Sequence, residues 1–216
     1  MMTTPSTPSI STHTPRTKTI LYLHGFASSG ASGTVLMLRS VMYPHDVRVE
    51  APDIPTSPSE AMDFIRSTVT RLEPDLIVGT SMGAMYAEQQ RGYPRILVNP
   101  AWGIAHRLML SGLGNRKFFN KRADGATAFK VDRRMLAEFD EVERQAFDGI
   151  DDMERALVWG LFGKDDPVVH TRPDFVAHYG EEQCVDFEGT HQLNDRVLKD
   201  TVLPIVADIL GLENLR

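Results

Sequence analysis

The chain has 216 residues and a mass of 24.1 kDa, enough for one domain with a full hydrophobic core, and its length gives no reason to expect a second domain. Its net charge of −6 offers no basic field to nucleic-acid phosphates, and no apolar stretch is long enough to span a membrane, so neither partner is expected. The single cysteine, Cys184, excludes an internal disulfide and a multi-cysteine zinc site and suits a cytoplasmic protein.

The N-terminal 17 residues are rich in Thr, Ser and Pro, a composition that predicts a disordered tail because it buries too little apolar surface to offset its ordering entropy. After this tail the sequence alternates between strand and helix patterns. Short apolar, partly β-branched runs predict strands over 19–23, 47–50, 76–79, 95–98, 155–161 and 183–187. Helical patterns cover 31–42, 58–73 and 82–91, with Ser57 as the cap of the second helix and Gly92 closing the third.

Strands that alternate with helices pair in parallel, so the fold class is a doubly wound α/β sheet of about six strands with helices on both faces. We expect residues 18–216 to form one domain. Residues 100–155 are the one long departure from the alternation and contain an amphipathic helix that Asp132 caps. This segment is interpreted as a cap insertion over the edge of the sheet where ligands bind, with ordinary scaffold as the alternative.

The sequence GTSMG, residues 79–83, follows the third predicted strand and precedes a helix. In that context the G-x-S-x-G pattern predicts a sharp turn that exposes the hydroxyl of Ser81, while the small flanking residues let the strand and the helix pass closely. The pattern alone is weak, since composition produces it by chance in roughly one chain in ten. A serine nucleophile also needs a base and an acid from elsewhere in the chain.

Both partners follow later strands in the order that this fold requires. Asp166 comes directly after the fifth predicted strand, and His191 after the sixth. We therefore expect Ser81 as nucleophile, His191 as base and Asp166 as acid, with Asp165 as the alternative acid. The plainer alternatives are a turn serine, a turn aspartate before Pro167 and a histidine at a helix start.

An acyl-transfer site also needs N–H donors for the oxyanion. The backbone N–H groups of Met82, after the nucleophile, and Phe26, after the first strand, are the predicted donors. His24 is interpreted as structural, because His191 already fills the role of base.

The motifs YLHGFASSG, GTSMGA, VNPAWG, GKDDPVV and EGTHQL occur in this order over about residues 18–212. Together they resemble those of small bacterial α/β-hydrolases of the YqiA/YcfP-like branch. The resemblance implies a serine esterase in which Ser81, Asp166 and His191 occupy the matching motifs.

The remaining features predict no further chemistry. Residues 116–122 place basic side chains around two phenylalanines and are interpreted as a solvated face rather than a clamp for an anionic substrate. Met62, Met82 and Met85 are expected in the core. No metal site is predicted, because His45, His106, His170 and His178 lack ligand spacing.

The sequence thus predicts a cytoplasmic serine hydrolase that needs no cofactor and acts on small carboxylic ester or thioester substrates through an acyl-enzyme. An acyltransferase with the same three residues and a non-catalytic ligand-binding protein on this scaffold are the alternatives.

Overall fold

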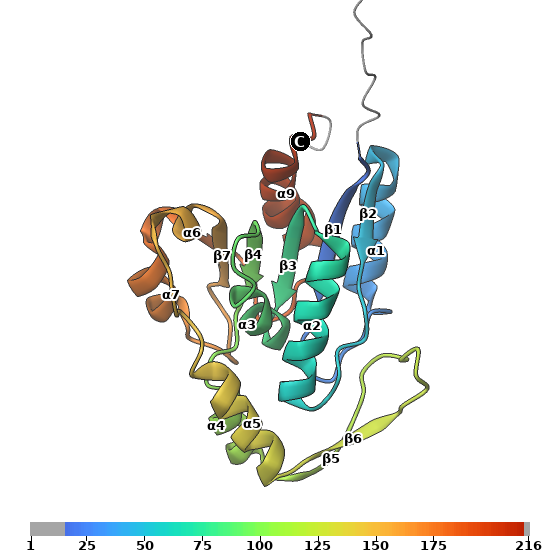
Figure 1. Ribbon diagram of the computed structural model, residues 1–216, viewed down its shortest axis with the longest axis vertical. Coiled ribbons are helices and arrows are strands. Elements are labelled where there is room, and N and C mark those ends of the chain that lie inside the picture. Colours follow the sequence, from blue (N-terminus) through green and yellow to red (C-terminus); the bar gives the residue numbers. More distant parts are fainter. Residues whose placement is uncertain (1–15, 214–216) are drawn as a thin grey trace, which may run out of the picture.

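A computed structural model describes residues 16–213. The disordered tail predicted for residues 1–17 lies outside the described residues, apart from its last two. The central feature is a six-stranded parallel sheet with the order β2-β1-β3-β4-β7-β8 (Figure 1). Its strands are β1 (Lys18–Leu23), β2 (Val47–Glu50), β3 (Leu76–Thr80), β4 (Arg95–Val98), β7 (Val158–Gly163) and β8 (Cys184–Phe187). The predicted fold class is confirmed.

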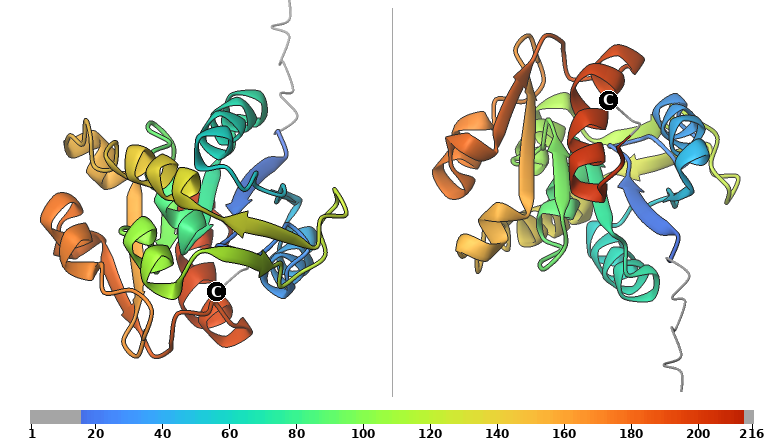
Figure 2. Two further views of the ribbon diagram at one scale, coloured as in Figure 1. Left: turned by 90° about the horizontal axis from the view of Figure 1, so that it is seen from below. Right: turned by 90° about the horizontal axis from the view of Figure 1, so that it is seen from above.

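Helices cover both faces of this sheet (Figure 2). One face packs against α2 (Pro58–Leu72), α3 (Met82–Glu88) and α7 (Arg172–Tyr179), and the other against α1 (Gly33–Met42), α8 (Asp195–Val197) and α9 (Leu203–Leu210). Alternate residues of β1 serve the two faces: Leu21 and Leu23 belong to one core, Ile20 and Tyr22 to the other. Because both faces are covered, the central strands are apolar throughout instead of alternating with polar residues.

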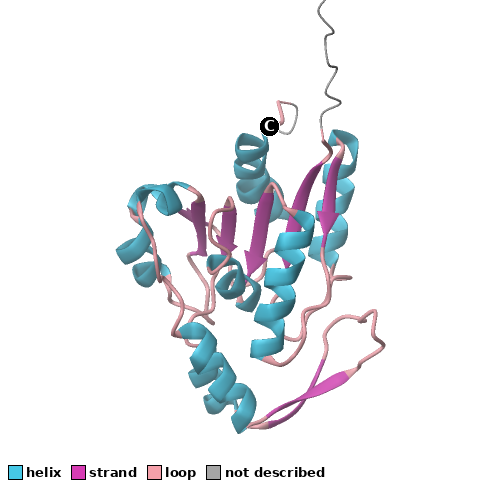
Figure 3. Ribbon diagram, viewed as in Figure 1, coloured by secondary structure: helices cyan, strands magenta, loops and turns pink. Residues whose placement is uncertain are grey.

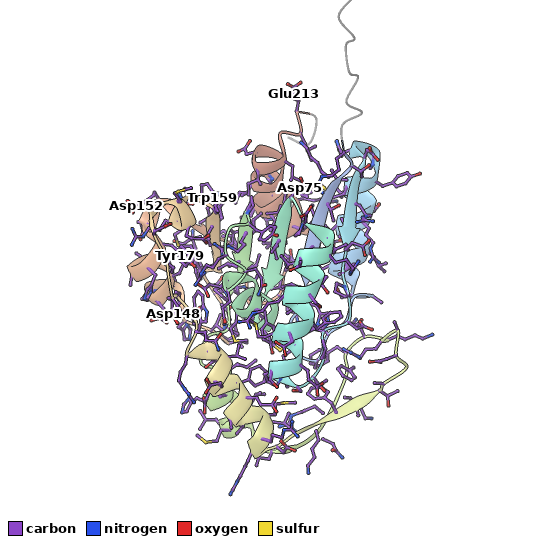
Figure 4. All side chains as sticks on the ribbon, viewed as in Figure 1. Asp75, Asp148, Asp152, Trp159, Tyr179 and Glu213 are labelled. Atoms are coloured by element: carbon purple, nitrogen blue, oxygen red, sulfur yellow. The ribbon has the colours of Figure 1, made fainter. Side chains whose placement is uncertain are left out.

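Between β4 and β7 the chain forms α4 (Ile104–Ser111), a hairpin of β5 (Gly114–Lys117) and β6 (Ala128–Val131), α5 (Arg133–Glu143) and α6 (Asp152–Ala156). In Figure 3 α4, α5 and the hairpin lie beyond the carboxyl ends of the strands. Figure 4 places Asp75, which precedes β3, at the opposite end of the sheet. Helices α4 and α5 and the hairpin therefore lie at the edge where the loops with the predicted site residues meet.

The predicted helix after Asp132 is α5, and the Asp132 carboxylate accepts the Met135 N–H at 3.1 Å. The hairpin was not predicted. Short connections complete the fold: 3₁₀ turns at Tyr43–His45 and Glu181–Gln183, and a π turn at Leu198–Val202 that joins α8 to α9. No helix among residues 16–213 is long and apolar enough to cross a bilayer.

Two predicted boundaries are wrong. The strand expected over 155–161 begins only at Val158, because Asp151 accepts the Glu154 N–H at 2.8 Å and starts α6 instead. The helix expected over 82–91 ends at Glu88, since the Gln90 side chain and the Gln89 N–H both bond the Tyr86 carbonyl in place of another helical turn. In both cases local side-chain bonds to the backbone outweigh the hydrophobic pattern.

The two glycines of the G-x-S-x-G turn lie where no side chain fits. A Cβ at Gly83 would lie 2.0 Å from the Leu23 carbonyl oxygen of β1, and one at Gly79 would lie 2.5 Å from the Gly83 oxygen. Glycine at both positions therefore lets β1, β3 and α3 approach one another around Ser81.

We expect Gly83→Ala to lower the free energy of unfolding by about 1–3 kcal/mol or more, since the obstacle is rigid strand backbone. Gly33→Ala is the matched control, because no heavy atom lies within 4 Å of the Cβ it would add at the first residue of α1. Urea unfolding midpoints measure both effects. Equal midpoints for the two variants would contradict the close approach.

Candidate active site

Ser81 lies in a strained turn between β3 and α3. Its φ of 54° and ψ of −118° fall outside the regions that side-chain-bearing residues favour, at a cost of about 1–3 kcal/mol. Hydrogen bonds hold the turn: the Ser81 N–H donates to the Val98 carbonyl at 2.9 Å, and the Ser81 carbonyl accepts the N–H groups of Ala84, Met85 and Ala101. The strain therefore persists because β4 and α3 fix the backbone on both sides.

The three predicted catalytic side chains meet at the carboxyl edge of the sheet. The His191 Nε2 atom lies 2.9 Å from the Ser81 Oγ atom, and the His191 Nδ1 atom lies 2.8 Å from the Asp166 Oδ2 atom. A carboxylate only accepts hydrogen bonds, so Nδ1–H donates to Asp166, and in the tautomer whose single proton is on Nδ1 the Nε2 atom accepts from the Ser81 hydroxyl. The Asp166 side chain is 3% exposed and that of His191 is 20% exposed.

The Asp166 carboxylate is aimed by its own loop. Its Oδ1 atom accepts the N–H groups of Val168 at 2.7 Å and Val169 at 3.1 Å, which leaves Oδ2 for His191. Asp166 is thus a turn residue and the histidine's partner at once. The Asp165 side chain is exposed, while its backbone N–H donates to the Gly189 carbonyl. The loop therefore brings Asp166, and not Asp165, to the imidazole.

His191 lies in the loop after β8 and does not begin the helix that follows. Asn194 caps α8, accepting the Val197 N–H at 2.9 Å.

Asn99 is a positioning residue that sequence reasoning missed. It follows β4 with a φ of 46°, and its side-chain NH₂ group donates to the carbonyls of Thr190 and His191, each at 3.1 Å. Its Oδ1 atom accepts the Gly163 N–H at 2.8 Å. Asn99 therefore ties the loop of the histidine to the end of β7. The signal in the sequence was an amide side chain directly after an apolar predicted strand.

The predicted oxyanion donors lie beside Ser81. Met82 follows it directly, and a Cβ on Gly25, the neighbour of Phe26, would lie 3.9 Å from the Ser81 Oγ atom. The loop that carries Phe26 is held by the hairpin segment: the Phe119 N–H donates to the Ala27 carbonyl at 2.8 Å. The hydroxyls of the same loop donate to the Asn120 side chain at 3.0 Å and the Lys121 carbonyl at 2.9 Å.

A cavity of about 580 Å³ opens beside Ser81 and His191, and we call it the site cavity. Its walls come from the Phe26 loop, from α4 through Ile104 and Leu108, and from the loop after His191. This volume is typical of a small-molecule site. Among residues 16–213 no cluster of three or more His, Cys, Asp or Glu side chains could hold a metal ion.

Two neighbouring side chains are structural. The Nε2 atom of His24 accepts the Ile54 N–H at 3.0 Å, and its Nδ1–H donates to the Gly25 carbonyl at 2.9 Å, so the ring is neutral. Arg122 corrects the prediction of a solvated basic face, since it is buried, pairs with Asp124 at 3.0 Å and lies over the Phe118 ring. Met62, Met82 and Met85 are buried in the core, as predicted.

The strand order, the helices on both faces and the G-x-S-x-G turn define the class by its architecture: the chain has the α/β-hydrolase fold. The chain belongs to the uncharacterised protein family UPF0227, whose model matches residues 19–206.

Solved structures share this fold at low sequence identity. A structure of the metagenome-derived lipolytic enzymes LipS and LipT is 15% identical with a TM-score of 0.64, covering 90% of this chain and 94% of that one. Est1E from Butyrivibrio proteoclasticus is 14% identical (TM-score 0.59, covering 90% and 88%). The mouse α/β-hydrolase domain-containing protein 10 is 12% identical (TM-score 0.59, covering 91% and 90%).

Burial lowers the pKa of His24 below its usual 6.5, so the folded state keeps the ring neutral where the unfolded state binds a proton. Stability from this group is therefore present above about pH 6.5 and is lost as the pH falls below it. We expect the free energy of unfolding to fall less between about pH 7.5 and about pH 5.5 in His24→Gln than in the wild type. Urea unfolding at both pH values measures this, with the exposed His106→Gln as control. An equal pH dependence in the wild type and His24→Gln would refute it.

Proposed function

We propose that this protein is a serine hydrolase that cleaves small carboxylic esters or thioesters through an acyl-enzyme. The observation that carries the proposal is the His191 ring, which lies within hydrogen-bond distance of both the Ser81 hydroxyl and the Asp166 carboxylate. This arrangement lets one imidazole take a proton from the nucleophile while a buried carboxylate stabilises the imidazolium that forms.

The reaction follows from these contacts. The Ser81 oxygen attacks the substrate carbonyl as its proton passes to His191 Nε2, and the imidazolium then protonates the leaving alcohol or thiol. The N–H groups of Phe26 and Met82 are the proposed donors to the oxyanion, where one such donor is worth about 2.7–4 kcal/mol of transition-state stabilisation. Water, activated by the same imidazole, then releases the acid and restores Ser81.

The substrate binds in the site cavity under this proposal, with the segment between β4 and β7 as its cap. The position of α4 and the hairpin at the carboxyl edge supports this role (Figure 2). The description of LipS and LipT as lipolytic agrees with esters as the first substrates to test.

Ser81→Ala is expected to lower kcat/KM for p-nitrophenyl acetate by at least about a thousandfold, because no other group can form the acyl-enzyme. A fluorophosphonate probe should label the wild type and leave the variant unlabelled. Turnover and labelling that do not depend on Ser81 would reject the serine mechanism. An unlabelled, inactive wild type would favour a binding protein, and transfer of the acyl group to an added alcohol in preference to water would favour an acyltransferase.

Asp166→Asn is expected to lower kcat for the same ester on the order of a hundredfold or more, because the amide no longer holds the imidazole in the required tautomer. Asp165→Asn is the matched control. It removes the same charge from the neighbouring residue, whose side chain is exposed, and should change kcat by less than about twofold. Equal losses in both variants would show that the charge of the loop matters and the contact with His191 does not.

A further inference from the structure

Among the described residues that line the site cavity, one side chain carries a permanent charge, and the proposed mechanism does not use it. Among the described residues that line the cavity, Arg107 of α4 is the only Lys, Arg, Asp or Glu. The remaining lining is mainly apolar, hydroxyl or amide in character, and includes Leu108, Leu193 and Asn120. A permanent positive charge in such a wall is unusual, because a charge that loses its contact with water is destabilising unless a partner compensates it.

Within the described part of the chain, Arg107 contacts neutral groups and has carboxylates only beyond ion-pair distance. Its Nη1–H group donates to the Val168 carbonyl, its Nε atom is buried without a hydrogen-bond partner, and no carboxylate forms an ion pair with it. Glu143 of α5 attracts it electrostatically, but the Oε1 atom of Glu143 accepts the Ile104 N–H at 2.7 Å at the start of α4. Glu143 therefore fixes the helix that carries Arg107 instead of pairing with its guanidinium.

The two most deeply buried arginines differ from Arg107 because each forms an ion pair with a carboxylate. Arg95 pairs with Glu154, and Arg122 pairs with Asp124. These two side chains have structural partners within the protein. Arg107 is half-buried, faces a cavity and keeps guanidinium N–H groups that no protein carboxylate occupies.

We propose that Arg107 determines specificity by binding an anionic group, a carboxylate, that the ester or thioester substrate carries in addition to its reacting carbonyl. This inference rests on the proposed hydrolase function. The planar guanidinium suits a carboxylate because it donates parallel N–H bonds in a fixed geometry. The Val168 carbonyl anchors the guanidinium two residues from Asp166, which places the positive charge on the catalytic side of the cavity. In a chain with a net charge of −6, this local charge offsets the general repulsion of an anion.

Two matched ester pairs test the proposal. The first compares the anionic mono-p-nitrophenyl glutarate with the neutral p-nitrophenyl pentanoate, which places the charge on the acyl side. The second compares p-acetoxybenzoate with its methyl ester, which places the charge on the leaving group. The quantity of interest is the ratio of kcat/KM for the anionic ester to kcat/KM for its neutral partner.

Arg107→Gln is expected to lower this ratio at least about tenfold in one of the pairs while leaving the neutral ester's kcat/KM within about threefold. Arg107→Lys should restore part of the ratio, since it keeps the charge and loses the planar donor geometry. Arg144→Gln is the control for net charge, because Arg144 is an exposed residue of the cap segment whose ion pair, among residues 16–213, is with Glu141. Its ratios should equal those of the wild type.

Salt dependence in the wild type gives a test that needs no variant. Attraction by Arg107 makes kcat/KM for the anionic ester fall between about 0.02 M and about 0.5 M salt, whereas repulsion by the net charge would make it rise.

A response in either pair supports the proposal and says which side of the ester carries the anion. Unchanged ratios in Arg107→Gln, together with Ser81-dependent hydrolysis of the neutral esters, would overturn the specificity role and leave the hydrolase intact. If Arg107→Gln and Arg107→Lys both lose neutral-ester activity, the salt dependence decides: a rise with salt would overturn the proposal. Absence of Ser81-dependent hydrolysis in the wild type would overturn both.

Discussion

The site depends on one steric constraint, the close approach of β1, β3 and α3 around Ser81. Gly79 and Gly83 remove the side chains that would keep these elements apart, and the helix begins directly after a residue held at positive φ. The turn is strained, and the bonds from Ser81 to Val98 and Ala101 keep it in place. The same packing that buries the apolar faces of β1 and β3 therefore presents the serine hydroxyl at the edge of the sheet.

Asp166 and the loop of His191 are held in place mainly by hydrogen bonds with backbone groups, and less by ion pairs. Asp166 is aimed by two N–H groups of its own loop, and the loop of His191 is fixed by the amide of Asn99. Such bonds orient a residue without adding a charge that would compete with the contact between Asp166 and His191. The parallel sheet brings these residues together, because the loops after β3, β4, β7 and β8 all emerge at one edge.

The segment between β4 and β7 forms part of the wall of the site cavity and holds the loop of Phe26. Its hairpin bonds the loop of Phe26, and its helix α4 supplies one wall of the site cavity together with the unpaired Arg107. Helix α4 is in turn fixed to α5 through Glu143. The common fold accounts for how Ser81 is presented, whereas this segment determines the shape and the charge of the space in front of it.

The sequence by itself determined where the sheet strands lie along the chain, the helix caps at Ser57 and Asp132, and Ser81 and His191 as site residues, because each depends on local periodicity or on a motif at a strand end. It could not predict the hairpin: Gly114–Lys117 has neither alternation nor apolar residues, and its pairing with β6 and the bonds of the connecting residues to the Phe26 loop join distant parts of the chain. The choice of Asp166 over Asp165, the function of Asn99 and the unpaired state of Arg107 were likewise decided only by the tertiary structure. Each of them is a matter of which groups come within hydrogen-bond distance across loops, and spacing along the chain does not specify that distance.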